Sequence, residues 1–180
     1  MSEKITLTVE EVAIKQLESA IWMYAYDFDE TAVHTIAAAA YELLTKRLNF
    51  GDFEDQFAKQ IPDSKKGEFW SKFNEPYNFF KHGANRHKNM DTLTYSSDSV
   101  ELVLMAACYA NTYMEKSKQL ACAHAFMSYQ MVRWPNFFED SEYKKMVNEL
   151  RRKALEGDIN IHDKKLLVLS LGQIKKPFIV

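Results

Sequence analysis

Residues that break helices are scarce in this chain, and their scarcity limits the folds it can adopt. The 180 residues include five glycines and four prolines, well under the roughly 12% of average usage. β-Sandwiches and barrels need such residues at their turns, so the composition disfavours them. Apolar residues instead recur at intervals of three and four, which is the spacing of a helix face. We therefore expect an all-α fold.

The length indicates one domain, because domains commonly contain about 150 residues. We predict a single-domain helical bundle of six or seven helices over residues 1–180. Its core bundle spans 9–135, and C-terminal helices and a tail at 141–180 pack on that core. The apolar stripe at 141–157 is flanked by charged residues, which is typical of a surface helix.

Local signals place the first helices. Thr8 and Glu11 form a predicted capping box for a helix over about 9–26. The segment Asp27–Asp29 is expected to turn the chain and cap a second helix, which packs on the first as an antiparallel hairpin. A third helix is expected after Lys66, with a kink or a fresh start at Pro76, because proline removes a backbone donor.

A long polar loop is expected between the third and fourth helices, over residues 84–97. The next helix, from Val100 to Tyr113, is apolar on nearly every side. We therefore expect it to be central. The tail Pro177–Val180 adds exposed hydrophobic residues. Since both segments need cover, we also predict a homodimer, in which a second copy supplies it.

Charge and cysteine usage bear on location and partners. The formal net charge is −2 and the sequence pI about 6.2, so any anion site must be local. The N-terminus is polar, and the longest apolar run, Leu102 to Ala110, is half as long as a membrane span. Cys108 and Cys122 lie in apolar stretches without metal spacing. We predict a cytoplasmic protein with no membrane segment, no cofactor and no metal.

One polar segment begins at the end of the third helix and concentrates positive charge; we call it the basic segment. The residues from Lys81 to Lys88 include five that are basic or ionisable and none that is acidic; they are Lys81, His82, Arg86, His87 and Lys88. Lys81 and His82 end a helix, where the dipole favours cations. Several donors that converge on one polyanion are what a phosphate site requires. The alternative interpretation is a solvated cationic loop balanced by Asp91 and Asp98.

The string Asn78-Phe79-Phe80-Lys81-His82-Gly83 resembles the end-of-helix motif of the HEPN superfamily. The motif's asparagine and histidine correspond to Asn78 and His82, whereas Tyr77 occupies the position of its arginine. The resemblance implies a dimeric bundle of four or five helices with facing motifs. In active members it implies a metal-independent ribonuclease with His82 as acid/base.

The first 135 residues or so are also similar to an uncharacterised bacterial helical family. That family carries an N-F-F-K-H motif together with a V-H-T segment, here Val33-His34-Thr35. No activity follows from this second resemblance. The leading hypothesis is a non-enzymatic interaction or regulatory protein in which Asn78 and the basic segment hold an anionic or phosphate-bearing partner, RNA included. A ribonuclease is the alternative.

A metal-dependent hydrolase is the third hypothesis. His82, His87 and Asp91 have the spacing of metal ligands, and Glu30 lies one helical turn before His34. Arg86 and Lys88 beside those histidines oppose a cation. His34 and His124 lie in otherwise apolar helices, where a buried or boundary histidine with one hydrogen bond is expected. Both cysteines are expected to be unreactive, because apolar surroundings raise a thiol pKa.

Overall fold

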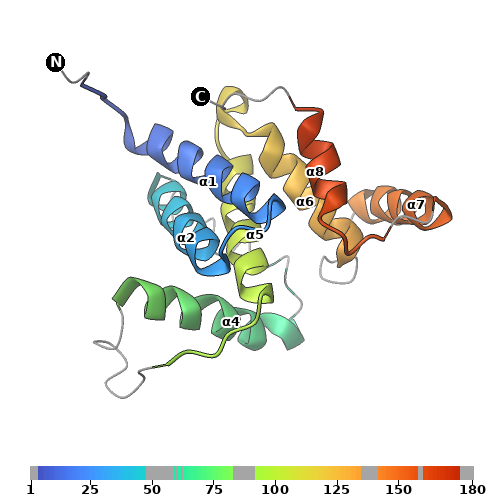
Figure 1. The fold of residues 1–180 in the computed structure, drawn as a ribbon, viewed down its shortest axis with the longest axis horizontal. Helices are drawn as coiled ribbons and strands as arrows, with labels where there is room; N and C mark the ends of the chain where they lie inside the picture. The colour runs from blue at the N-terminus through green and yellow to red at the C-terminus, as the bar shows by residue number, and fades with distance from the viewer. Residues whose placement is uncertain are drawn as a thin grey trace.

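The computed structural model describes residues 4–47, 59, 61, 63–82, 92–134, 142–157 and 160–174. These residues form seven α-helices and a short 3-10 helix, and they contain no strand (Figure 1). The predicted all-α bundle is thereby confirmed. The helices are α1 (Val9–Ala25), α2 (Glu30–Arg47), α4 (Asp63–His82), α5 (Asp98–Thr112), α6 (Ala121–Arg133), α7 (Glu142–Glu156) and α8 (Lys165–Gly172), and the 3-10 helix is η2 (Lys116–Lys118).

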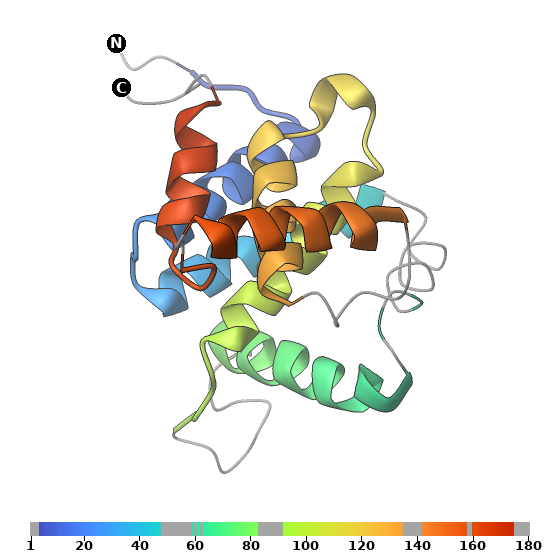
Figure 2. The same cartoon turned by 90° about the vertical axis from the view of Figure 1, so that its right-hand side faces the viewer.

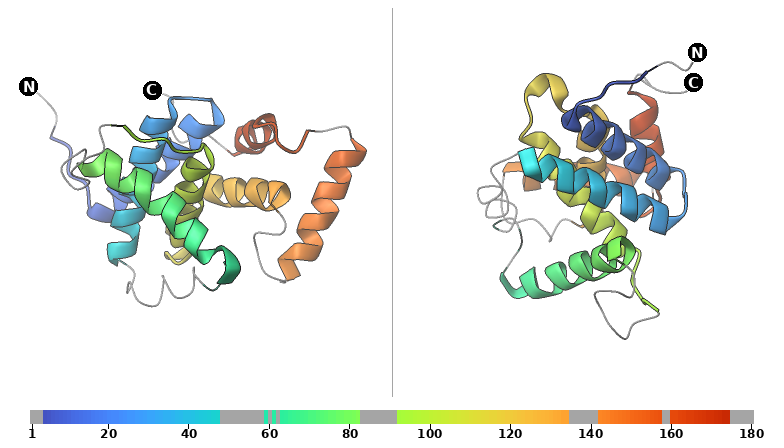
Figure 3. Two further views of the ribbon diagram at one scale, coloured as in Figure 1. Left: turned by 90° about the horizontal axis from the view of Figure 1, so that it is seen from below. Right: turned by 90° about the vertical axis from the view of Figure 1, so that its left-hand side faces the viewer.

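Helices α1 and α2 lie side by side as the predicted hairpin (Figure 3, right). The Thr8 hydroxyl accepts the Glu11 N–H at 3.2 Å, and Glu11 accepts the Thr8 N–H at 2.7 Å, which completes the capping box. Asp27 adopts φ 55° in the turn, a conformation that aspartate tolerates better than most residues. Asp29 then accepts the Ala32 N–H at 3.0 Å and caps α2 as expected.

Helix α5 is the centre of the bundle. It contacts α1, α2, α4 and α6, and from Ser99 to Cys108 every residue is buried. The expected central position is confirmed. The cover of this helix comes from the same chain, however, so its apolar surface does not require a second copy. The tail Pro177–Val180, which was the other reason to expect a dimer, lies outside the described residues.

Helix α4 differs from the prediction in two ways. It begins at Asp63, before Lys66, and it continues through Pro76 to His82 without a break. Pro76 is buried, and the aromatic side chains of Phe73 and Phe80 contact α2 residues on either side of it. These contacts anchor the helix to α2 on both sides of the proline, despite the missing backbone donor. The helix ends at His82, immediately before Gly83, as expected.

The C-terminal helices lie on the side of α6 (Figure 2). Helix α8 contacts α6 and α1 and buries Leu167 and Leu171, while α7 contacts α6. Helix α6 ends at Arg133, and α7 ends at Glu156, with the Gly157 N–H donating to the Lys153 carbonyl at 3.1 Å. Among the described residues, no helix has the length and apolar character needed to cross a membrane.

Candidate functional site

Three of the predicted site residues, Asn78, Lys81 and His82, belong to the carboxyl end of α4. Asn78 is half-buried and lines a shallow surface hollow with Trp70, Ser71, Asn74 and Glu75. Lys81 and His82 are the last two residues of the helix. The side chains of these two residues, and all of Arg86, His87 and Lys88, lie outside the described part of the chain.

The two segments that carry the bacterial-family resemblance meet in space. His34 of α2 contacts the ring of Phe80 of α4 edge to face, with ring centroids 5.1 Å apart. Phe80 in turn contacts Tyr95 at 5.2 Å, and the Tyr95 hydroxyl lies 3.3 Å from the Thr31 hydroxyl. Phe80 is therefore fixed between α2 and the segment that leads into α5. Phe80 directly precedes Lys81, so these contacts also hold the backbone in place where the basic segment begins.

His34 is fully buried, at 0% exposure. Among the described residues neither of its ring nitrogens has a hydrogen-bond partner. Burial lowers the pKa of His34 to about 4, because the cation loses its hydration. The expectation of a core histidine is confirmed, but the expected hydrogen bond is not found. His34 is therefore a neutral packing residue next to the basic segment.

Tyr77, at the position that the HEPN resemblance assigns to an arginine, contacts α2. Its hydroxyl donates to the Glu42 carboxylate at 2.9 Å. That same carboxylate pairs with Lys46 at 2.8 Å. A phosphate placed at Tyr77 would meet a carboxylate instead of a guanidinium. Tyr77 therefore brings no positive charge of the kind that an arginine would supply to a transition-state phosphate.

The other histidines and carboxylates bear on the metal hypothesis. Within the described residues no group of three His, Cys, Asp or Glu side chains could hold a metal ion. Glu30 is exposed whereas His34 is fully buried, so the predicted pair does not form a surface site. His124 is exposed, contrary to the prediction, because it points outward from α6. The triad of His82, His87 and Asp91 lies outside the described side chains.

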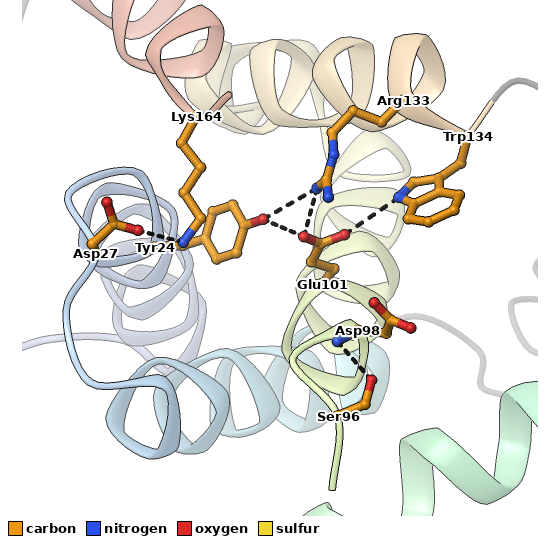
Figure 4. Close-up of polar contacts among 8 residues, drawn as sticks. All are labelled: Tyr24, Asp27, Ser96, Asp98, Glu101, Arg133, Trp134 and Lys164. Carbon is orange, nitrogen blue, oxygen red and sulfur yellow. Dashed lines mark hydrogen bonds and ion pairs between the residues drawn. The ribbon is translucent and has the colours of Figure 1, made fainter. Parts of the chain in front are cut away.

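A second polar cluster, which the sequence analysis did not identify, centres on Glu101 of α5 (Figure 4). One carboxylate oxygen accepts from the Tyr24 hydroxyl and, at 2.5 Å, from Nη1 of Arg133. The other accepts from the Trp134 indole at 3.4 Å. The Arg133 and Glu101 side chains are only 12% and 10% exposed. We call these four residues the Glu101 cluster; it joins α1, α5 and the end of α6.

Lys164, just before α8, extends this cluster toward the C-terminal helices. Its ammonium lies 4.0 Å from the Tyr24 ring centroid and 2.7 Å from the Asp27 carboxylate. Burial and the Glu101 carboxylate together raise the Tyr24 pKa far above its usual value. Tyr24 therefore remains a donor at every physiological pH. With both Glu101 oxygens occupied, the cluster acts as a structural connection between helices.

The sequence did not reveal this cluster, because its members lie at positions 24, 101, 133 and 134 and form no motif. One signal was available, namely a charged residue, Glu101, inside an otherwise apolar helix. Buried carboxylates require partners.

The two cysteines behave as predicted from their surroundings. Both are free and buried. Burial raises the pKa of Cys108 well above its usual value and that of Cys122 to about 12. Since the thiolate is the reactive form, neither is a nucleophile in the folded protein.

Comparison with protein-family models, with curated proteins and with solved structures finds no match to this chain. Function therefore has to be argued from the residues at the carboxyl end of α4 and from the Glu101 cluster.

Proposed function

We propose that this protein is a non-enzymatic helical interaction protein whose basic segment, Lys81–Lys88, binds a phosphate-bearing partner. The segment begins at the carboxyl end of α4, where the helix dipole favours cations. Phe80, immediately before it, is held between His34 and Tyr95. A segment attached to a fixed point loses less conformational entropy on binding than one attached to a mobile point.

The contact between Tyr77 and Glu42 is the observation that favours binding over catalysis. A HEPN-type ribonuclease requires a cation to stabilise the phosphate that His82 would act on. In this chain a carboxylate lies 2.9 Å from the hydroxyl of the residue in that position. The basic segment can still hold a phosphate through charge-assisted hydrogen bonds, which need several donors and no chemical step.

The test is a titration with inorganic phosphate at low salt, followed through the histidine ring signals by NMR. We expect His82 and His87 to shift, and we expect the shifts to weaken as salt screens the charges. A triple variant, Lys81→Glu/Arg86→Glu/Lys88→Glu, should lose at least about tenfold in affinity. A short single-stranded RNA and a phosphopeptide are then compared to identify the source of the phosphate.

The matched control carries the same change in net charge on exposed lysines elsewhere: Lys4→Glu/Lys59→Glu/Lys116→Glu. If both triple variants lose affinity equally, the effect is one of overall charge and the assignment to the basic segment is wrong. Metal-independent RNA cleavage that His82→Ala abolishes would instead establish the ribonuclease.

As part of the same proposal, we place the protein in the cytoplasm as a homodimer. Two buried free thiols suit a reducing compartment, and the apolar tail Pro177–Val180 is the reason that remains for association. Light scattering at about 100 μM checks it, since even a micromolar dimer is mostly assembled there. A mass near 21.0 kDa would contradict the dimer.

A further inference from the structure

The last turns of α6 bury polar atoms that the Glu101 cluster does not satisfy. Gln130 is fully buried, at 0% exposure, and neither its amide nitrogen nor its amide oxygen has a hydrogen-bond partner in the described part of the chain. The hydroxyl of Tyr129 and Nε of Arg133 are also buried without a partner there. Buried polar side-chain atoms nearly always have a partner, so this group of atoms requires an explanation.

Helix geometry and ring contacts place these atoms on one side of α6. Gln130 lies three residues before Arg133 and Tyr129 lies four before it, and both spacings join neighbours on a helix surface. The guanidinium carbon of Arg133 is 5.2 Å from the Tyr129 ring centroid. Phe126, one turn before Gln130, contacts the Tyr24 ring edge to face at 5.5 Å. This side of α6 therefore faces α1 and α5, where Arg133 meets the Glu101 cluster (Figure 4).

The unpartnered atoms match a small neutral ligand that both donates and accepts hydrogen bonds. Nε of Arg133 donates, the Gln130 amide does both, and the Tyr129 hydroxyl does either. The charge of Arg133 is already balanced by Glu101, so an ion would find no unpaired charge here. The full burial of Gln130 leaves access only to a small molecule. Water has these properties, and a buried water typically makes about three hydrogen bonds to atoms of this kind.

We infer that buried water binds between Gln130, Arg133 and Tyr129 and extends the Glu101 cluster along α6. The water accepts from Nε of Arg133 and donates to the Gln130 amide oxygen and to the Tyr129 hydroxyl oxygen. Because one molecule cannot bond to both ends of the same amide, the Gln130 nitrogen requires a second water. The connection between α1, α5 and α6 is therefore hydrated, and this site is independent of the basic segment.

The first experiment detects bound water by NMR in the full chain, with the Gln130 side-chain amide assigned through a Gln130→Leu variant. Bound water gives rotating-frame Overhauser contacts to nearby protons, and these have the opposite sign to chemical exchange with water. We expect such contacts at the Gln130 amide protons. Gln119 is the matched control, because its amide nitrogen already donates to the Thr112 and Met114 carbonyls at 2.8 and 2.9 Å. We expect no comparable contact at Gln119.

Thermal unfolding distinguishes a hydrated site from one that is dry. If the polar atoms are hydrated, Gln130→Leu displaces the water and leaves Arg133 and Tyr129 unpartnered, so the melting temperature should fall by about 2–4 °C or more. If the site is dry, leucine removes two unpartnered atoms and the melting temperature should rise. Tyr129→Phe is the milder variant, because it deletes only the hydroxyl, and it should move the melting temperature in the same direction. Tyr26→Phe, on an exposed ring, should leave it nearly unchanged.

Two results would overturn the water site. One is the absence of a water contact at the Gln130 amide when its signals are observed and assigned. The other is a melting temperature that rises in both Gln130→Leu and Tyr129→Phe, since only unpartnered atoms would be removed. A water contact at Gln130 but not at Gln119, together with a lower melting temperature in both variants, supports the site.

Discussion

Breaking the ion pair between Glu101 and Arg133 should strongly destabilise the fold. Both side chains are nearly buried, and Nη1 of Arg133 lies 2.5 Å from the carboxylate. Removal of one member leaves the other charge without a partner, and such losses cost about 3–5 kcal/mol in buried pairs. We expect Arg133→Met to reach this range, because it leaves a buried carboxylate with only Tyr24 and Trp134 as donors. For a chain of this length the melting temperature should fall by about 6–20 °C.

A double-mutant cycle distinguishes the pair from general damage to the core. Glu101→Met/Arg133→Met should cost less than the sum of the single variants, because neither charge is then left alone. It should still be less stable than the original protein by about 1–3 kcal/mol, since the Tyr24 hydroxyl loses its acceptor. Adding Tyr24→Phe to the double variant should recover most of that loss. Urea denaturation followed by circular dichroism provides the free energies.

The control is an exposed ion pair, Lys65 with Glu68 at 3.5 Å. Lys65→Met should change stability by no more than about 0.5 kcal/mol, as is usual for surface pairs. Two results would refute the reasoning. One is an Arg133→Met variant as stable as Lys65→Met, and the other is strict additivity of the Glu101 and Arg133 substitutions.

Three further predictions concern groups elsewhere. The pKa of His34 is about 4 in the folded protein and near 6.5 when unfolded, so the unfolded chain binds the extra proton first as the pH falls. The free energy of unfolding should therefore decrease from pH 6.5 to pH 4 by up to about 3 kcal/mol. In denaturation experiments, a His34→Leu variant should show a smaller dependence of this free energy on pH. Thr8→Ala removes the cap of α1 and should cost about 1 kcal/mol in the same assay. Cys108 and Cys122 should react with a thiol reagent only upon unfolding, as a colorimetric thiol assay will show; rapid reaction of the native protein would contradict their burial.

Elements whose signals are local could be predicted from the sequence. The capping box of Thr8 and the cap at Asp29 depend on residues within one turn of each other, so both were identified correctly. The central position of α5 followed from its apolar composition alone. Of the two outcomes expected at Pro76, a kink or a fresh start, the fresh start does not occur, because the helix is continuous there. The rings of Phe73 and Phe80 hold the helix in place on both sides of the proline.

The site residues show the same division. Asn78 and the basic segment could be proposed as a site because they are adjacent in sequence, and they stay a prediction. The Glu101 cluster was missed because its members are far apart in sequence; Tyr24 and Arg133, for example, are separated by 109 residues. His124 was placed in or near the core because its neighbours in sequence are apolar, but its own position on α6 faces solvent. Periodicity assigns a face to a helix, but only packing decides which residues at its boundary are covered.

The places where this chain departs from the rules of a stable core suggest where its function lies. His34 buries two ring nitrogens that have no partner among the described residues, at a cost that a leucine would avoid. That departure lies at Phe80, next to the start of the basic segment. The Glu101 cluster satisfies both carboxylate oxygens, but Nε of Arg133 and both amide atoms of the neighbouring Gln130 are buried without a partner among the described residues. Departures of this kind, which are expected at functional sites, therefore occur both beside Phe80 and at the end of α6.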